Sequence, residues 1–144
     1  MKRSKLLVAG ICVVGVVLST SVAFAKPLSE QQWRKQANVF CKQSNKDVGA
    51  IGDAAYAGLG PNDQPTAAQN TAFSAQAGPR IEQTIASIDA LNEPKALKKA
   101  VKKLVAVAND AVATMAANPS TNEDQALFDE VNKLSKRLGL VCGG

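Results

Sequence analysis

The chain has 144 residues, 46% of them hydrophobic, a length that suits one small domain rather than two. It contains no histidine, which removes the commonest general base and metal ligand and excludes the usual serine and cysteine triads. Its formal net charge is +5, but three basic residues and no acidic ones lie in the first 25 positions, so residues 26–144 carry only +2. We therefore predict no nucleic-acid partner from charge.

Residues 1–25 have the pattern of a secretory signal peptide. Basic residues near the amino terminus precede an uncharged run over residues 6–25, and Ala23 and Ala25 fit the small-residue positions of a signal-peptidase site. We expect cleavage after Ala25, which leaves residues 26–144 as a helical domain that is secreted or held in the cell envelope. An uncleaved membrane anchor is the alternative, because about twenty uncharged residues span a bilayer. Either outcome exports the domain.

Two cysteines remain once the signal is removed, in a domain that reaches an oxidising compartment. We expect Cys41 and Cys142 to form a disulfide. Its loop of about 100 residues would contribute on the order of 4 to 5 kcal/mol by restricting the unfolded chain. Two free thiols or a metal pair are the alternatives, and a metal site would need further ligands other than histidine. We predict no metal site.

The first predicted helix follows Ser29, which we expect to form a capping box with Gln32, with Leu28 packed as a hydrophobic staple. A core-facing stripe at helical spacing then consists of Trp33, Ala37, Phe40, Cys41, Ser44, Val48, Ile51 and Ala55. The composition of residues 60–65 predicts a surface loop.

A second helical segment covers about residues 66–91. Its first half is rich in alanine and glutamine, with Phe73 as the one large apolar anchor, so we expect it to be held weakly. Pro79 predicts a kink or a fresh helix start, because proline lacks a donor and clashes with the preceding turn.

A third helix is expected to begin around Pro94, capped by Asn92 or Glu93. A fourth is expected to follow a capping box of Ser120 and Glu123. We expect this helix to end at Gly139, with Leu140 folded back in a Schellman cap. The residues of the fourth helix that we expect to be buried are Leu127, Phe128, Val131, Leu134 and Leu138.

No segment of residues 26–144 alternates with the period of a strand, so the predicted fold is all-α. Short connections favour an up-and-down four-helix bundle closed by one disulfide, after a signal peptide. The bridge from Cys41 to Cys142 is expected to tie the carboxyl-terminal segment onto the first helix.

The spacing of several residues resembles small exported two-cysteine helical proteins of actinobacteria, whose function is mostly unassigned. These residues are Trp33, Cys41, Asn45, Leu91, Pro94 and the segment 138–143. The resemblance covers most of residues 26–144. It implies a fold and no chemical site, because its markers are a cysteine pair and helix punctuation.

Five lysines form a stripe on the third predicted helix, opposite its apolar face: Lys95, Lys98, Lys99, Lys102 and Lys103. The helix dipole disfavours cations at the amino-terminal end, so helix stabilisation does not account for them. We interpret the lysine stripe either as a solubility device or as a contact for anionic lipid or cell-wall polymer.

No catalytic residue is predicted. Met115 and Tyr56 are interpreted as core residues rather than haem ligands, and no cofactor is predicted. The acidic residues of the fourth helix are assigned to a solvated face: Glu123, Asp124, Asp129 and Glu130. The preferred hypothesis is a non-enzymatic binding or interaction module of the cell envelope, acting on a polymer, lipid or protein partner. The alternative is a small enzyme with Arg34, Arg80 and Glu82 converging inside the bundle.

Overall fold

The computed structural model describes residues 26–119 and 126–143, and all regular structure within these ranges is helical. The four helices are α1 (Glu30–Ala55), α2 (Ala67–Asp89), α3 (Lys98–Ala117) and α4 (Ala126–Leu138). The all-α fold predicted from the sequence is confirmed. The predicted signal peptide over 1–25 and the capping box of Ser120 and Glu123 lie outside the described residues.

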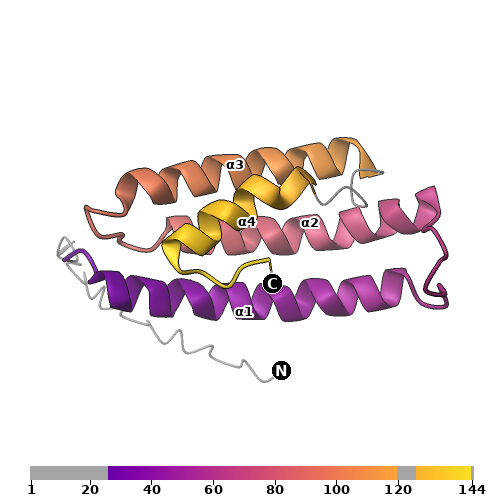
Figure 1. Ribbon diagram of the computed structural model, residues 1–144, viewed down its shortest axis with the longest axis horizontal. Helices are drawn as coiled ribbons and strands as arrows, with labels where there is room; N and C mark the ends of the chain where they lie inside the picture. The colour runs from indigo at the N-terminus through magenta and orange to yellow at the C-terminus, as the bar shows by residue number, and fades with distance from the viewer. Residues whose placement is uncertain (1–25, 120–125, 144) are drawn as a thin grey trace, which may run out of the picture.

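The helices pack in chain order, α1 on α2, α2 on α3 and α3 on α4. Figure 1 shows the three long helices side by side, with the shorter α4 crossing obliquely in front of them. Within the described ranges, none of the helices combines the length and the apolar character that a membrane crossing needs. Helices α1 and α4 make few direct contacts, and the segment that follows α4 provides most of the connection between them.

The amino-terminal end of α1 confirms the predicted capping box. The backbone N–H of Gln32 donates to Ser29 Oγ at 3.2 Å, and the backbone N–H of Ser29 donates to Gln32 Oε1 at 3.2 Å. Leu28 packs against the core next to this cap. One turn further on, Trp33 and Ala37 are fully buried, so the predicted stripe does face the interior.

Helix α2 runs through Pro79 as one helix, and the predicted fresh start there is wrong. Gly78 lies against α3, and a Cβ built at this glycine would be 3.6 Å from Met115 Cε. Gly78 is buried at the contact between α2 and α3, and Pro79 is exposed. Packing therefore outweighs the lost hydrogen bond.

The first half of α2 is held better than its composition predicts. Phe73 packs against Tyr56, with ring centroids 5.4 Å apart, and Tyr56 Oη donates to Asn70 Oδ1 at 3.2 Å. Asn70 and Ser74 are buried. Polar residues can be buried when they are hydrogen-bonded, so Asn70 and Ser74 contribute to holding this half of α2, although the composition of the segment does not show it.

Helix α3 begins at Lys98, about one turn later than predicted. The carbonyl of Pro94 accepts from the backbone N–H groups of both Leu97 and Lys98, at 2.9 and 3.1 Å, so residues 94–97 form a turn before the helix. Leu97 is the N-cap and makes no side-chain capping bond, so the predicted caps at Asn92 and Glu93 are wrong. The apolar face of α3 is buried through Val101, Leu104, Ala108, Val112 and Met115.

The end of α4 has the geometry of a Schellman cap, as predicted. Gly139 has φ of +72°, its N–H donates to the Lys136 carbonyl at 3.0 Å, and the N–H of Leu140 donates to the Ser135 carbonyl at 2.9 Å. Leu140 is buried in a core to which all four helices contribute. This cap turns the chain toward α1.

Candidate functional site

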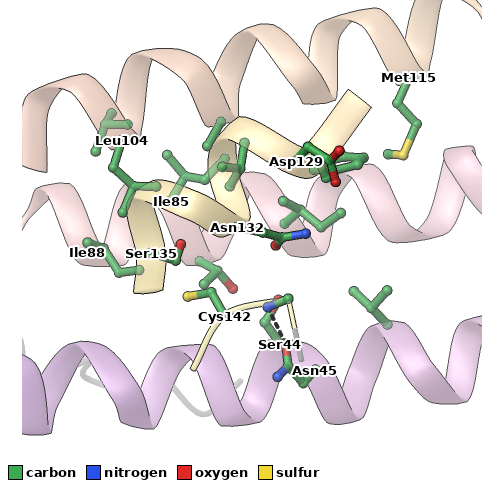
Figure 2. A pocket seen from close by; sticks show the side chains of 18 of the residues that line it. Ser44, Asn45, Ile85, Ile88, Leu104, Met115, Asp129, Asn132, Ser135 and Cys142 are labelled. Atoms are coloured by element: carbon green, nitrogen blue, oxygen red, sulfur yellow. Dashed lines mark hydrogen bonds between the residues drawn. The ribbon is translucent and has the colours of Figure 1, made fainter. Parts of the chain in front are cut away.

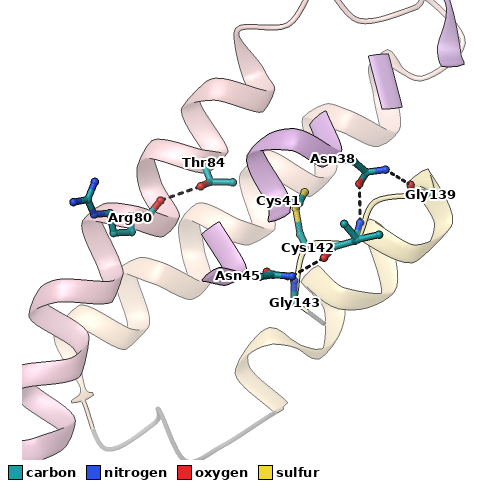
Figure 3. The surroundings of a disulfide bond; sticks show 9 residues. Asn38, Cys41, Asn45, Arg80, Thr84, Gly139, Cys142 and Gly143 are labelled. Atoms are coloured by element: carbon teal, nitrogen blue, oxygen red, sulfur yellow. Dashed lines mark hydrogen bonds between the residues drawn. A yellow bond between two sulfur atoms is a disulfide. The ribbon is translucent and has the colours of Figure 1, made fainter. Parts of the chain in front are cut away.

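The segment after α4, residues 139–143, is bound along α1 and closes one end of the space between α1 and α4. Its covalent link is the predicted disulfide between Cys41 and Cys142, whose Cα atoms are 4.5 Å apart (Figure 3). Cys41 is fully buried. The pairing predicted from the sequence is therefore confirmed, and the segment is fixed at the middle of α1.

Two asparagines of α1 bind the backbone of this segment on either side of the disulfide. Asn38 Nδ2 donates to the Gly139 carbonyl at 3.1 Å, and Asn38 Oδ1 accepts from the N–H of Val141 at 2.8 Å. Asn45 Nδ2 donates to the Val141 carbonyl at 2.8 Å, and Asn45 Oδ1 accepts from the N–H of Gly143 at 3.2 Å. Each amide thus satisfies one donor and one acceptor of an otherwise irregular segment.

A cavity of about 650 Å³ lies between α1 and α4, with α2 and α3 as its inner wall and the bound segment at one end (Figure 2). All four helices and the segment line it: Ser44, Asn45, Val48, Gly49, Phe73, Ile81, Thr84, Ile85, Ile88, Leu104, Val105, Ala108, Met115, Phe128, Asp129, Val131, Asn132, Ser135, Cys142 and Gly143. Cavities of about 300 to 1,000 Å³ hold drug-sized ligands.

The buried wall of the cavity is apolar apart from Ser135, and the residues at its mouth are exposed. Ile88, Leu104 and Met115 are at most 4% exposed. Gly49 on α1 and Asp129 on α4 are exposed and mark the mouth. A Cβ built at Gly49 would meet no heavy atom within 4 Å, so space remains open there.

The polar groups of the lining differ in whether the protein already satisfies them. Thr84 Oγ1 donates to the Arg80 carbonyl at 3.0 Å, and Asn45 binds the segment after α4. Ser135 is fully buried, and its Oγ has no hydrogen-bond partner. A buried, unpaired hydroxyl costs free energy, so Ser135 has bonding capacity to offer a ligand.

Lys98, Lys99, Lys102 and Lys103 of the lysine stripe lie on α3, whereas Lys95 lies in the turn before it. All five residues are exposed. Lys103 differs from the others because its Nζ donates to Glu130 Oε1 on α4 at 3.1 Å. This hydrogen bond, with the nearby charges of Lys133 and Arg137, holds the pKa of Glu130 below its ordinary value. Lys103 therefore fixes α3 to α4.

The three residues considered for an interior polar site do not come together. Arg34 donates through Nε to the Leu138 carbonyl at 2.9 Å and pairs with Glu30 at 3.0 Å. Arg80 and Glu82 are exposed on α2. None of the three lines the cavity. Across residues 26–119 and 126–143, no cluster of three or more metal-ligating side chains occurs.

The sequence pattern does not predict the cavity. The pattern places Ser44 on the core stripe of the first helix and Asp129 on a solvated face, whereas both residues line the cavity, with Asp129 at its mouth. A usable signal was Ser135: it lies seven residues after Phe128 and four after Val131, so it falls on the apolar face of α4. A hydroxyl at such a position must find a partner.

Comparison with known proteins gives no relatives: no protein-family model, no curated protein and no solved structure matches the chain.

Proposed function

We propose that the chain is an exported, non-enzymatic binding module of the cell envelope that holds a small apolar molecule between α1 and α4. The cavity carries this proposal, because about 650 Å³ of mostly apolar space opens beside an otherwise packed core. The cavity is open to solvent at its mouth, so its apolar wall lacks packing partners there. A bound apolar ligand would supply those partners, so the cavity suits a ligand.

The size of the cavity indicates the size of the ligand. At about 30 Å³ for each water-sized unit, the cavity has room for roughly twenty heavy atoms. Its α2 wall extends from Phe73 to Ile88, which is about 22 Å at 1.5 Å per residue. An elongated molecule, such as one with an alkyl chain, suits these dimensions.

The composition of the lining favours binding over catalysis in this proposal. Among the described residues that line the cavity, Asp129 is the one charged side chain, and it lies at the mouth. General acid–base chemistry needs titratable groups positioned against the reacting atoms. An enzyme with a polar site inside the bundle remains the alternative hypothesis, with no residue assignment from Arg34, Arg80 and Glu82.

Binding of diphenylhexatriene, a fluorescent hydrocarbon without hydrogen-bonding groups, tests the proposal. We expect saturable binding to the oxidised domain, and loss of at least tenfold in affinity in Gly49→Leu, which places a side chain at the open mouth. Ala50→Leu is the matched control, because Ala50 is the exposed neighbour that does not line the cavity. Equal binding by both variants would contradict the proposal.

The lysine stripe supports a second proposed role, contact with anionic lipid or cell-wall polymer. Among the described residues, Lys103 is the member of the stripe that forms an ion pair, and the first turn of α3 contains no acidic residue. Near an anionic surface each lysine is worth about 1 kcal/mol. Co-sedimentation with anionic vesicles and with cell-wall polymer, at low and physiological salt, tests this role.

The matched variants for that experiment carry equal changes in charge. Lys98, Lys99 and Lys102 are changed to Gln in one, and the exposed α1 lysines Lys35, Lys42 and Lys46 in the other. We expect only the first variant to lose salt-sensitive binding. Equal losses would indicate a general charge effect and contradict the assignment to the stripe.

The same proposal includes cleavage of residues 1–25 and an up-and-down order of the four helices, with α4 attached to α1 through the disulfide. The disulfide is consistent with an oxidising extracytoplasmic compartment. We also propose that the chain is related to the small exported helical proteins of actinobacteria. This part of the proposal rests only on the cysteine pair and on the residues that begin and end the helices.

A further inference from the structure

We infer that the cavity selects an uncharged amphiphile, whose hydroxyl or carbonyl group binds Ser135 Oγ and whose alkyl chain lies along α2 and α3. This inference rests on the proposed function and names the chemical class of its ligand. Two observations carry it: the unpaired hydroxyl of Ser135 at the inner end of the cavity, and the distribution of charge around the lining.

Ser135 differs from several other hydroxyl residues on the described helices. Helical hydroxyls commonly bond the carbonyl four residues earlier, and this occurs at Thr71, Thr84, Ser87 and Thr114 at 2.8 to 3.0 Å. Ser135 makes no such bond, although it is fully buried. Its hydroxyl can both donate and accept, so a ligand hydroxyl or carbonyl would satisfy it.

The position of Ser135 sets the orientation of the ligand. Figure 2 shows Ser135 on α4 near Cys142 and Ile88, at the opposite end of the cavity from Met115. A polar group bonded to Ser135 would leave the alkyl chain to run toward Met115 and Phe73. The lining between these ends includes the apolar Ile85 and Val105, and Asn132 and Asp129 on the α4 side.

The charges around the cavity disfavour an anionic head group. No lysine or arginine is found among the described residues of the lining, and Asp129 places a negative charge at the mouth. The nearby cations Lys103 and Lys133 are engaged with Glu130, at 3.1 and 4.0 Å. A carboxylate moved into the cavity would lose its hydration without gaining a cation, which is costly. An alcohol avoids this cost.

Competition for bound diphenylhexatriene tests the selection. Decanol and decanoate have the same chain length and differ in head-group charge at neutral pH. We expect decanol to displace the probe at a concentration at least about tenfold lower than decanoate. Decanoate that displaces the probe as well as decanol would overturn the inference.

Two substitutions assign the selection to residues. Ser135→Ala is expected to weaken decanol binding about fivefold while diphenylhexatriene, which cannot hydrogen-bond, binds as before. Ser87→Ala is the control, because its hydroxyl is bonded within α2 and lies outside the cavity lining. Asp129→Asn is expected to strengthen decanoate binding severalfold and leave decanol unchanged. Unchanged decanol affinity in Ser135→Ala would overturn the role of Ser135.

The two levels of the proposal fail differently. If diphenylhexatriene does not bind the oxidised domain, the proposed function is wrong and the inference falls with it. If the hydrocarbon binds and Gly49→Leu prevents it, while decanol and decanoate compete equally, the cavity is a binding site but its selection for uncharged ligands is wrong.

Discussion

Asn38 accepts a hydrogen bond from the backbone N–H of Val141 at 2.8 Å, across 103 residues of chain, and its amide also donates to the Gly139 carbonyl. Asn45 repeats this pattern two turns further along α1. The two asparagines therefore pair both donors and acceptors of residues 139–143, a segment that has no regular secondary structure of its own. Four predictions concern this attachment and the helices around it.

Removal of the disulfide by Cys41→Ala with Cys142→Ala is expected to lower the free energy of unfolding by about 4 kcal/mol, because the bridge closes a loop of about 100 residues in the unfolded chain. Urea unfolding, followed through the fluorescence of the fully buried Trp33, measures the change. A loss smaller than about 1 kcal/mol would show that the hydrogen bonds alone hold the segment.

With the disulfide intact, Asn38→Ala is expected to cost about 1 kcal/mol, since it removes two hydrogen bonds that water only partly replaces. The same urea titration measures this loss. Gln36→Ala, an exposed position on the same helix, is the control and should change stability by less than about 0.5 kcal/mol. Equal effects of the two variants would contradict the attachment described here.

Two glycines are expected to respond to alanine with opposite signs. Gly139→Ala should destabilise by about 1 kcal/mol, because φ is +72° and the added Cβ would approach Arg34 Cδ to 3.3 Å. Gly49→Ala should stabilise by about 0.5 to 1 kcal/mol, because it lies inside α1 with no neighbour within 4 Å. Thermal unfolding of both variants checks the signs; a shared sign would contradict the backbone assignments.

The ion pair between Lys103 and Glu130 predicts a dependence on pH. The hydrogen bond from Lys103 lowers the pKa of Glu130 in the folded state, so the pair contributes stability above the pKa of the unfolded chain. That contribution is lost as the pH falls through the lowered pKa. Lys103→Gln is expected to raise the pKa of Glu130 toward its ordinary value, as measured by NMR titration of the carboxyl carbon.

Lys99→Gln is the control for that titration, because Lys99 has an exposed side chain that does not contribute to the lowered pKa of Glu130. It should move the pKa of Glu130 much less. High salt should reduce the effect of Lys103, because both side chains are substantially exposed. An unchanged pKa of Glu130 in Lys103→Gln would contradict the contact between Lys103 and Glu130.

Local chemistry predicted the helix ends that depend on neighbouring residues. The capping box of Ser29 and the Schellman cap at Gly139 each involve residues within five positions, so the sequence contains all their partners. The disulfide was predictable because, beyond residue 25, only one pairing exists. These predictions required no knowledge of tertiary packing.

The failures arose where tertiary contacts decide the outcome. Pro79 stays inside α2 because Gly78 packs on α3, and that contact joins residues far apart in sequence. The cavity depends on how obliquely α4 crosses the other helices, which helical periodicity does not specify (Figure 1). Ser135 and Asp129 acquire their roles only from that crossing. Helical periodicity predicts which face of each helix is apolar. The angle at which the helices cross decides where those apolar faces contact each other and where a cavity remains between them.

The attachment of residues 139–143 to α1 also constrains the order in which this protein matures. Cys41 and Cys142 are 101 residues apart, so the bridge can form only when the end of the chain is present. A chain without residues 139–143 would leave uncovered the part of the core in which Leu140 is buried. Oxidation of Cys41 with Cys142 then marks completion, and a chain interrupted before residue 142 would present a free thiol and an open apolar face together.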